Sequence, residues 1–178
     1  MERLLQIVVQ DVPEAPLMTV RDALRWAEFR LCQDGNAWVV DEVPVTSDGS
    51  IIAPDDTYVV RALTVYRNGR EMIPSAEYEQ TSPGGVTIHR QNNTDTFTAR
   101  VAVKPTADGA MPEALRDQHL EALRHGATFR LLMLPQPWRN VEQAAYHETL
   151  FKAGINDAYR LSVYGQQQDA HVKPRGFI

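Results

Sequence analysis

The chain has 178 residues, a formal net charge of −5 and a single cysteine. This length fits one domain of ordinary size. Its 43% hydrophobic and 23% charged residues indicate a folded protein and argue against a disordered one. A net negative chain repels nucleic acid, which disfavours general DNA binding. Cys32 has no cysteine partner, so we expect a cytoplasmic protein without disulfides. No segment has the length of a signal sequence or membrane span, so no membrane contact is expected.

The first strong helical pattern covers residues 19–33. Apolar residues recur there at the spacing of one helix face: Val20, Leu24, Ala27 and Leu31. Asp34-Gly35-Asn36 is a typical helix end. The segment before it, Leu4 to Val9, predicts a short strand or an extended arm, which Pro13 and Pro16 terminate.

Residues 37–105 change from the helical period to runs of β-branched and aromatic residues separated by turn residues. The last run alternates, which places four of its residues on one face: Phe97, Ala99, Val101 and Val103. Asn68-Gly69 lies between two apolar runs and predicts a tight hairpin, because both residues tolerate positive φ. Ser82-Pro83-Gly84-Gly85 predicts another turn. The segment is therefore expected to form an antiparallel sheet of four to six strands.

Two further helices are predicted over residues 112–134 and 140–164, with a proline-rich break between them. Asn140 precedes the second of them as a capping residue. A link this short makes the two helices spatial neighbours. Gly126 and Gly154 lie inside these helices, where glycine costs about 1 kcal/mol relative to alanine. We expect close helix–helix approach to justify that cost.

The last segment, residues 165–178, is predicted to be a flexible tail that cannot make a core of its own. It ends in apolar residues behind basic ones: Lys173, Arg175, Phe177 and Ile178. Such a segment fits folding upon binding to an acidic or grooved partner. An unused flexible end is the alternative.

Together these patterns predict an α+β protein with one domain over residues 1–164. It would be a bundle of about three helices, one N-terminal and two C-terminal, with the antiparallel sheet inserted over residues 37–105. Residues 165–178 would extend from it as a tail. Trp26 and Trp38 flank the first helix and are expected to anchor it on the sheet.

The sequence carries no pattern that is typical of an active site. His119 and His125 are six residues apart and should point to different faces of their helix. His147 lacks a second histidine at the four-residue spacing of a zinc-protease helix. Since no two histidines are expected to share a face, we predict no metal, no cofactor and no catalytic residue. The adjacent carboxylates Asp55 and Asp56 predict a solvated turn.

The order of these features resembles the head-to-tail connector or adaptor proteins of tailed bacteriophages, including the tail-tube A proteins of short-tailed phages. The resemblance covers roughly residues 13–164 and is one of plan and spacing. It is carried by the segments Pro13-Glu14-Ala15-Pro16, Thr19 to Arg25, Trp38, Val65 to Arg70, Met111 to Leu115, Gly126-Ala127, Pro135-Gln136-Pro137-Trp138 and Ala144 to Ile155.

The resemblance implies a structural virion protein and not an enzyme. Such adaptors form a ring beneath the portal, which extends the DNA channel and supports the next tail (nozzle or tube) protein. A closed ring of about twelve copies is expected on the portal, with the isolated chain monomeric or weakly associated. DNA would be only passing cargo. The protein would be assembled in the host cytoplasm and reside at the head–tail junction of the virion.

The resemblance also assigns the tail a role, because the C-terminal segments of such adaptors commonly dock against the portal. The residues expected to make that contact are Lys173, Arg175, Phe177 and Ile178. Two other classes remain open. One is a different virion component, such as a head-completion (stopper) or minor tail protein. The other is a small enzyme of unrecognised type that uses His147 or His119.

Overall fold

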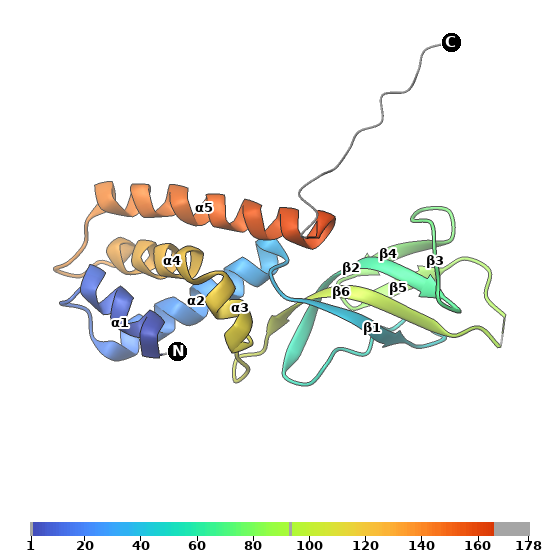
Figure 1. Ribbon diagram of the computed structural model, residues 1–178. Coiled ribbons are helices and arrows are strands. Elements are labelled where there is room, and N and C mark those ends of the chain that lie inside the picture. Colours follow the sequence, from blue (N-terminus) through green and yellow to red (C-terminus); the bar gives the residue numbers. More distant parts are fainter. Residues whose placement is uncertain (1, 93, 166–178) are drawn as a thin grey trace, which may run out of the picture.

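The computed structural model describes residues 2–92 and 94–165, which form an elongated body with helices at one end and strands at the other (Figure 1). Helices and strands occur together, as expected for an α+β protein. Within these residues there are five helices, where about three were predicted: α1 (Glu2–Asp11), α2 (Leu17–Gly35), α3 (Glu113–Gln118), α4 (Leu120–Met133) and α5 (Val141–Tyr164). The six strands are β1 (Val39–Val45), β2 (Thr57–Arg67), β3 (Arg70–Glu71), β4 (Tyr78–Ser82), β5 (Gly85–Ile88) and β6 (Phe97–Pro105).

The first segment is a helix, so the prediction of a strand or arm over Leu4 to Val9 was wrong. Leu4 and Val8 are four residues apart, lie on one face of α1 and are both buried in the helical core. A short run of aliphatic residues fits either a strand or a buried helix face, and the neighbouring helices decide between them. Here α1 packs against α2 and α4, which cover its apolar face.

Helix α2 matches the prediction, with two extra residues at each end. It begins directly after Pro16, whose carbonyl accepts a hydrogen bond from the Val20 amide at 3.0 Å. It ends at Asn36, which takes the left-handed conformation that commonly terminates helices. The preceding Gly35 lies where a Cβ would stand 2.9 Å from the Ile155 carbonyl oxygen, so the backbone at the end of α2 lies close to the backbone of α5. This contact brings the start of the β region close to the end of α5.

The strands form two sheets instead of the single sheet that was predicted. A four-stranded antiparallel sheet has the order β1-β6-β2-β3, and a separate two-stranded hairpin pairs β4 with β5. The predicted hairpin at Asn68-Gly69 joins β2 to β3, with both residues at positive φ. The predicted turn at residues 82–85 joins β4 to β5. Strand β6 is central, and the four alternating residues predicted for one face are all buried: Phe97, Ala99, Val101 and Val103.

The C-terminal helical region is divided differently from the prediction. The helix expected over residues 112–134 breaks at His119, which separates the short α3 from α4. Helices α4 and α5 then pack side by side, as predicted, and both glycines lie at that contact. A Cβ on Gly126 would stand 2.7 Å from the ring of Phe151, and one on Gly154 would stand 2.5 Å from the Ala122 Cβ. The expected close approach is confirmed.

The helical and β regions have separate cores joined at a narrow junction. Trp38 is half-buried and packs against both cores. Nearby, the Lys104 ammonium of β6 donates a hydrogen bond to the Gln33 amide oxygen at 2.9 Å and lies 4.1 Å from the centre of the Phe29 ring. Trp26 was predicted to anchor α2 on the sheet, and this prediction was wrong. Its ring lies against Phe129 and Phe151 within the helical core.

Candidate functional site

The four tail residues predicted to bind a partner lie outside the described residues: Lys173, Arg175, Phe177 and Ile178. The described chain stops at Gly165, directly after α5. Candidate sites are therefore sought in three places that the structure does describe. These are the polar contacts between α1, α4 and α5, the far end of the sheet, and the exposed face of α5.

Two histidines meet between α4 and α5, which corrects the expectation that no two histidines share a face. The Nδ1 atoms of His125 and His147 are 2.9 Å apart, a hydrogen-bond distance, and their ring centres are 5.0 Å apart. One Nδ1 must donate a proton and the other must accept it. The Tyr146 ring stands edge-on to His147 at a centre distance of 5.4 Å.

An acidic residue of α1 reaches the same place. Asp11 accepts hydrogen bonds from the Nε and Nη2 atoms of Arg124, both at 2.7 Å, and a third from the Thr128 hydroxyl at 3.1 Å. These donors hold the pKa of Asp11 below its usual value, although burial acts in the opposite direction. This charged pair and the histidine pair together link α1, α4 and α5 through polar contacts.

The pKa values of both paired histidines are lowered, chiefly because burial penalises the charged imidazolium. Arg124 lowers both pKa values further, and His125 also lowers that of His147. Asp11 acts in the opposite direction on both rings, and Glu121 does so on His125. The pair is therefore held mainly in the neutral state at pH 7.

The other residues that an enzyme could use lie apart from this pair. His119 is buried at the α3–α4 break, and burial lowers its pKa. Cys32 is fully buried in α2, and burial together with Glu28 raises its pKa to about 12, so its thiol is protonated at neutral pH. Asp55 and Asp56 form the exposed turn before β2 that was predicted. Among the described residues, no three histidine, cysteine, aspartate or glutamate side chains gather closely enough to hold a metal ion.

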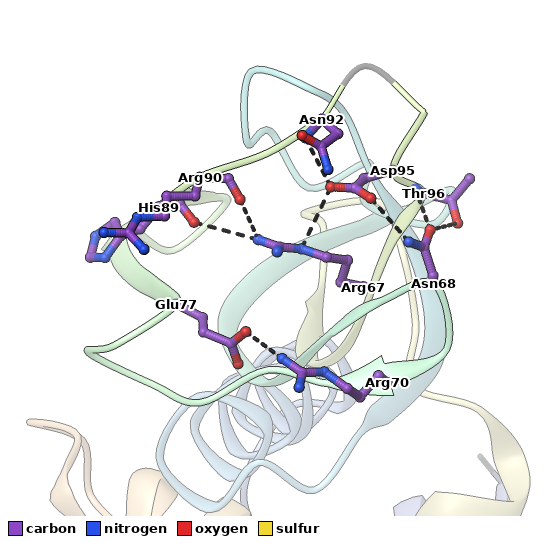
Figure 2. A network of polar contacts seen from close by, with 9 residues as sticks. All are labelled: Arg67, Asn68, Arg70, Glu77, His89, Arg90, Asn92, Asp95 and Thr96. Atoms are coloured by element: carbon purple, nitrogen blue, oxygen red, sulfur yellow. Dashed lines mark hydrogen bonds and ion pairs between the residues drawn. The ribbon is translucent and has the colours of Figure 1, made fainter.

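A polar network closes the far end of the sheet (Figure 2). Asn68, in the β2–β3 turn, donates to the Asp95 carboxylate at 3.0 Å and accepts from the Thr96 amide at 2.9 Å. Arg67 donates to the Arg90 carbonyl at 2.6 Å, which ties β2 to the chain that follows β5. Backbone donation from Asn92, together with Asn68 and Arg67, lowers the pKa of Asp95.

These contacts bind loops to one another. In Figure 2 the side chains of Arg67 and Asn68 point toward the loop residues that accept their hydrogen bonds. A separate ion pair joins Arg70 of β3 to Glu77, whose carboxylate also accepts from the Ile73 amide at 2.8 Å. The network therefore gives the far end of the sheet a fixed shape.

The exposed face of α5 carries large apolar and aromatic side chains. Helix α5 lies along one side of the bundle, on the side of α4 away from α1 (Figure 1). Val141 and Tyr159 are about five helical turns apart, as are Tyr146 and Tyr164, so each pair points in one direction. The two pairs are offset by five residues, so their directions differ by about 140° around the helix. The exposed apolar and aromatic residues in this arc are Val141, Tyr146, Tyr159, Val163 and Tyr164, and the exposed Glu142, Lys152 and Arg160 lie between them. Exposed aromatic residues with charged neighbours are typical of a surface that contacts another protein.

The hollow between α1 and α3 is lined mainly by charged side chains. It has a volume of about 390 Å³, and its lining consists of Glu2, Arg3, Glu113, Arg116 and Asp117 with Leu4 and Leu120. Ligand pockets are mostly apolar with a few polar groups, so this lining is unlike that of a typical ligand pocket. Within the described residues, no helix combines the length and the apolar character that crossing a membrane requires.

Comparison with known proteins gives no relative from which a function could be transferred. No protein-family model matches the chain, and no curated protein matches it.

The histidine pair was missed because its two residues are 22 positions apart and lie on different helices. A signal did exist in the sequence. The small residues Gly126 and Gly154 indicated which faces of α4 and α5 approach one another, and His125 and His147 lie beside that contact. Combining the glycine positions with an antiparallel helix pair would have placed the two imidazoles together.

Proposed function

We propose that this chain is a structural virion protein of a tailed bacteriophage, an adaptor that joins the portal at the head to the tail. The order of its elements supports this proposal, because a helix, an inserted sheet and two long packed helices follow one another as in the adaptor pattern. The three long helices α2, α4 and α5 pack against one another, and α1 and α3 are short additions. The described residues thus form a bundle of five helices, of which these three are the longest, with the sheet inserted between α2 and α3.

The observation that carries the proposal is the set of large aromatic and aliphatic side chains that α5 exposes near its two ends. This helix has 24 residues and is therefore about 36 Å long. Its inner side is buried through Ala144, Phe151 and Ala158, and its outer side exposes tyrosines and valines together with charged residues such as Lys152 and Arg160. A helix that is fixed on one side and exposes aromatic and charged groups on the other can contact a neighbouring copy in a closed ring. The proposed ring has about twelve copies, assembled on the portal.

The two-part shape suits a protein that touches different neighbours at its two ends. The helical region carries the exposed residues of α5, and Gly165 at the end of α5 lies near its junction with the sheet, whereas the far end of the sheet is closed by the loop network of Figure 2. In the proposal, the tail residues Lys173, Arg175, Phe177 and Ile178 bind the portal. The downstream nozzle or tube protein then binds the assembled ring. DNA passes through the ring without specific contacts.

The test is to produce the full chain together with the portal protein encoded in the same genome and to image the complex by electron microscopy. The proposal expects a ring of this chain on the portal. A portal that stays bare would overturn it. Attachment only in the presence of a further protein would instead favour a stopper or minor tail protein.

Two variants of the full chain sharpen this test. Replacing Tyr146 and Tyr159 with aspartate places charge on the exposed α5 face, so the ring should be lost while the monomer stays folded. The matched control is Tyr58→Asp on β2, a similarly exposed tyrosine that lies on the sheet and not on α5, which should leave the ring intact. Truncation after Tyr164 should leave a folded chain that no longer stays on the portal. If the truncated chain decorates portals normally, the tail has no docking role.

A further inference from the structure

The contact between His125 and His147 has a property that a generic polar contact lacks. Its Nδ1–Nδ1 distance of 2.9 Å requires one nitrogen to be without a proton. Two neutral imidazoles satisfy this requirement, and so does one neutral ring with one imidazolium. Two imidazolium rings do not, because both Nδ1 atoms would then be donors and both rings would carry positive charge.

We propose that the His125–His147 contact is a pH-sensitive latch between α4 and the first half of α5, closed while at most one ring is protonated and opened by the second proton. Each ring is attached to a different helix, so the repulsion acts between helices. The first ten residues of α5, 141–150, contain His147 and one deeply buried residue, Ala144. The rest of α5, from Phe151 onward, is held separately by Phe151, Ala158 and Ser162. The latch therefore controls one half of the helix.

The surrounding charges decide how readily the second proton enters. Asp11 from α1 and Glu121 from α4 favour protonation, and Arg124 from α4 opposes it. Glu121 is exposed, with its carboxylate 4.0 Å from the His125 Nε2 atom, so solvent screens its effect. Asp11 is already neutralised by its two hydrogen bonds from Arg124. What remains is burial and the mutual repulsion of the rings, and both oppose the second proton.

Burial and the repulsion between the two rings determine how the stability of the folded contact changes with pH. The folded pair binds its protons at lower pH than free histidines, whose ordinary pKa is 6.5. The unfolded chain therefore holds more protons in the interval below pH 6.5, and unfolding or local opening takes up protons. The contribution of the pair is fully present above pH 6.5 and is lost as the pH falls from there through the folded pKa values. The opening changes the placement of Val141 and Tyr146, which lie on the exposed face of the released half.

The test is backbone hydrogen exchange of the full chain at about pH 7.5 and about pH 5, corrected for the intrinsic pH dependence of exchange. In the wild type, amides of residues 141–150 should lose protection several-fold at the lower pH, while those of α2 lose less. His147→Gln keeps a side chain that can donate or accept a hydrogen bond but removes the titration, so the local loss should disappear. Equal loss in His147→Gln and the wild type would overturn the proposal.

Two further measurements keep the proposal falsifiable. His119→Gln is the matched control, because His119 is also buried with a lowered pKa but lies at the start of α4, outside the contact with His147. This variant should retain the loss of protection in residues 141–150. If His147→Gln does not fold, an NMR titration of the wild-type imidazole protons decides. Coupled titration of the two rings below pH 6.5 is expected, and two independent titrations at the ordinary value would contradict the latch.

Discussion

The helical and β regions of this protein are stabilised in different ways. The helical core depends on close fits between small and aromatic residues, such as Gly126 against Phe151, and on an ion pair buried between α2 and α3. The β core is a layer of valines on β6 and its neighbours, closed at the far end by hydrogen bonds between loops. The stability of the helical region therefore depends on a few contacts that are sensitive to single substitutions. The stability of the β region is distributed over many similar contacts.

This difference indicates which changes the two regions tolerate. A valine on a sheet face can be replaced by another β-branched residue at little cost, because the surface is regular. A glycine at a helix crossing or one partner of a buried ion pair has no substitute of similar shape and charge. The narrow junction at Trp38 determines whether a destabilising substitution in one region also destabilises the other region.

The largest effect is expected for the buried ion pair in the helical region. The Arg116 Nε atom lies 2.7 Å from the Glu28 carboxylate, whose side chain is only 3% exposed. Arg116→Met removes the partner and leaves a buried charge, which should lower the free energy of unfolding by about 3–5 kcal/mol. Urea denaturation measures the loss. The control is the double variant Glu28→Leu with Arg116→Met, which should recover most of the stability; a single variant as stable as the wild type would contradict this account.

A core truncation in the β region tests whether the two regions unfold together. Met72 is fully buried between β3 and the rest of the β core. Met72→Ala should cost about 2–5 kcal/mol through lost burial and the cavity that remains. If Trp38 couples the regions, the circular dichroism of the helices and the hydrogen-exchange protection of the β6 amides should be lost in one shared transition at the same urea concentration. Two separate transitions would show that the junction does not transmit the damage.

A smaller effect is expected at the helix crossing. Gly126→Ala introduces a methyl group 2.7 Å from the Phe151 ring and should destabilise the protein by about 1–3 kcal/mol. The cost should shrink when Phe151→Leu removes part of the obstructing ring, so the two changes should be non-additive. A double-mutant cycle followed by thermal unfolding measures this coupling. Strict additivity would mean that the two side chains do not meet.

The smallest effect concerns the loop network of the sheet. Hydrogen bonds from Asn92 and Asn68, and the charge of Arg67, hold the pKa of Asp95 below its ordinary value of 3.8. The ionised Asp95 carboxylate therefore stabilises the fold above pH 3.8, and this stabilisation is lost as the pH falls through the pKa of Asp95 in the folded state. Asp95→Asn should slightly lower the melting temperature at pH 7 and flatten its decline in acid. The exposed Asp55→Asn serves as the control, and an unchanged acid profile in Asp95→Asn would contradict the assignment.

The features that were predicted correctly are those whose causes lie close together in the sequence. The Asn68-Gly69 turn specifies its hairpin through two residues that tolerate positive φ. The alternation along β6 specifies its buried face, because side chains on a strand point alternately to its two sides. The Asn140 side chain accepts a hydrogen bond from the Gln143 amide at 3.0 Å, as the capping pattern predicted. In each case a few neighbouring residues contain the whole physical reason.

The features that were missed depend on contacts between distant segments. The residues of α1 could form a strand or a helix, and α2 and α4 select the helix by covering Leu4 and Val8. The break at His119 is likewise not marked by proline or glycine. It shows only in the fold, where His119 is buried between α3 and α4.

The sequence by itself determined the α+β class, helices α2 and α5, the buried face of β6 and the turns at residues 68–69 and 82–85, because periodicity and turn chemistry are local properties. Only the tertiary structure decided which helix faces meet, and with them the pairing of His125 with His147 and the bond of Asp11 to Arg124. Those contacts depend on how α1, α4 and α5 cross, and crossing is fixed by the packing of whole surfaces. The exposure of the α5 tyrosines has the same origin, since a helix with apolar residues on two sides can bury only the side that its neighbours cover.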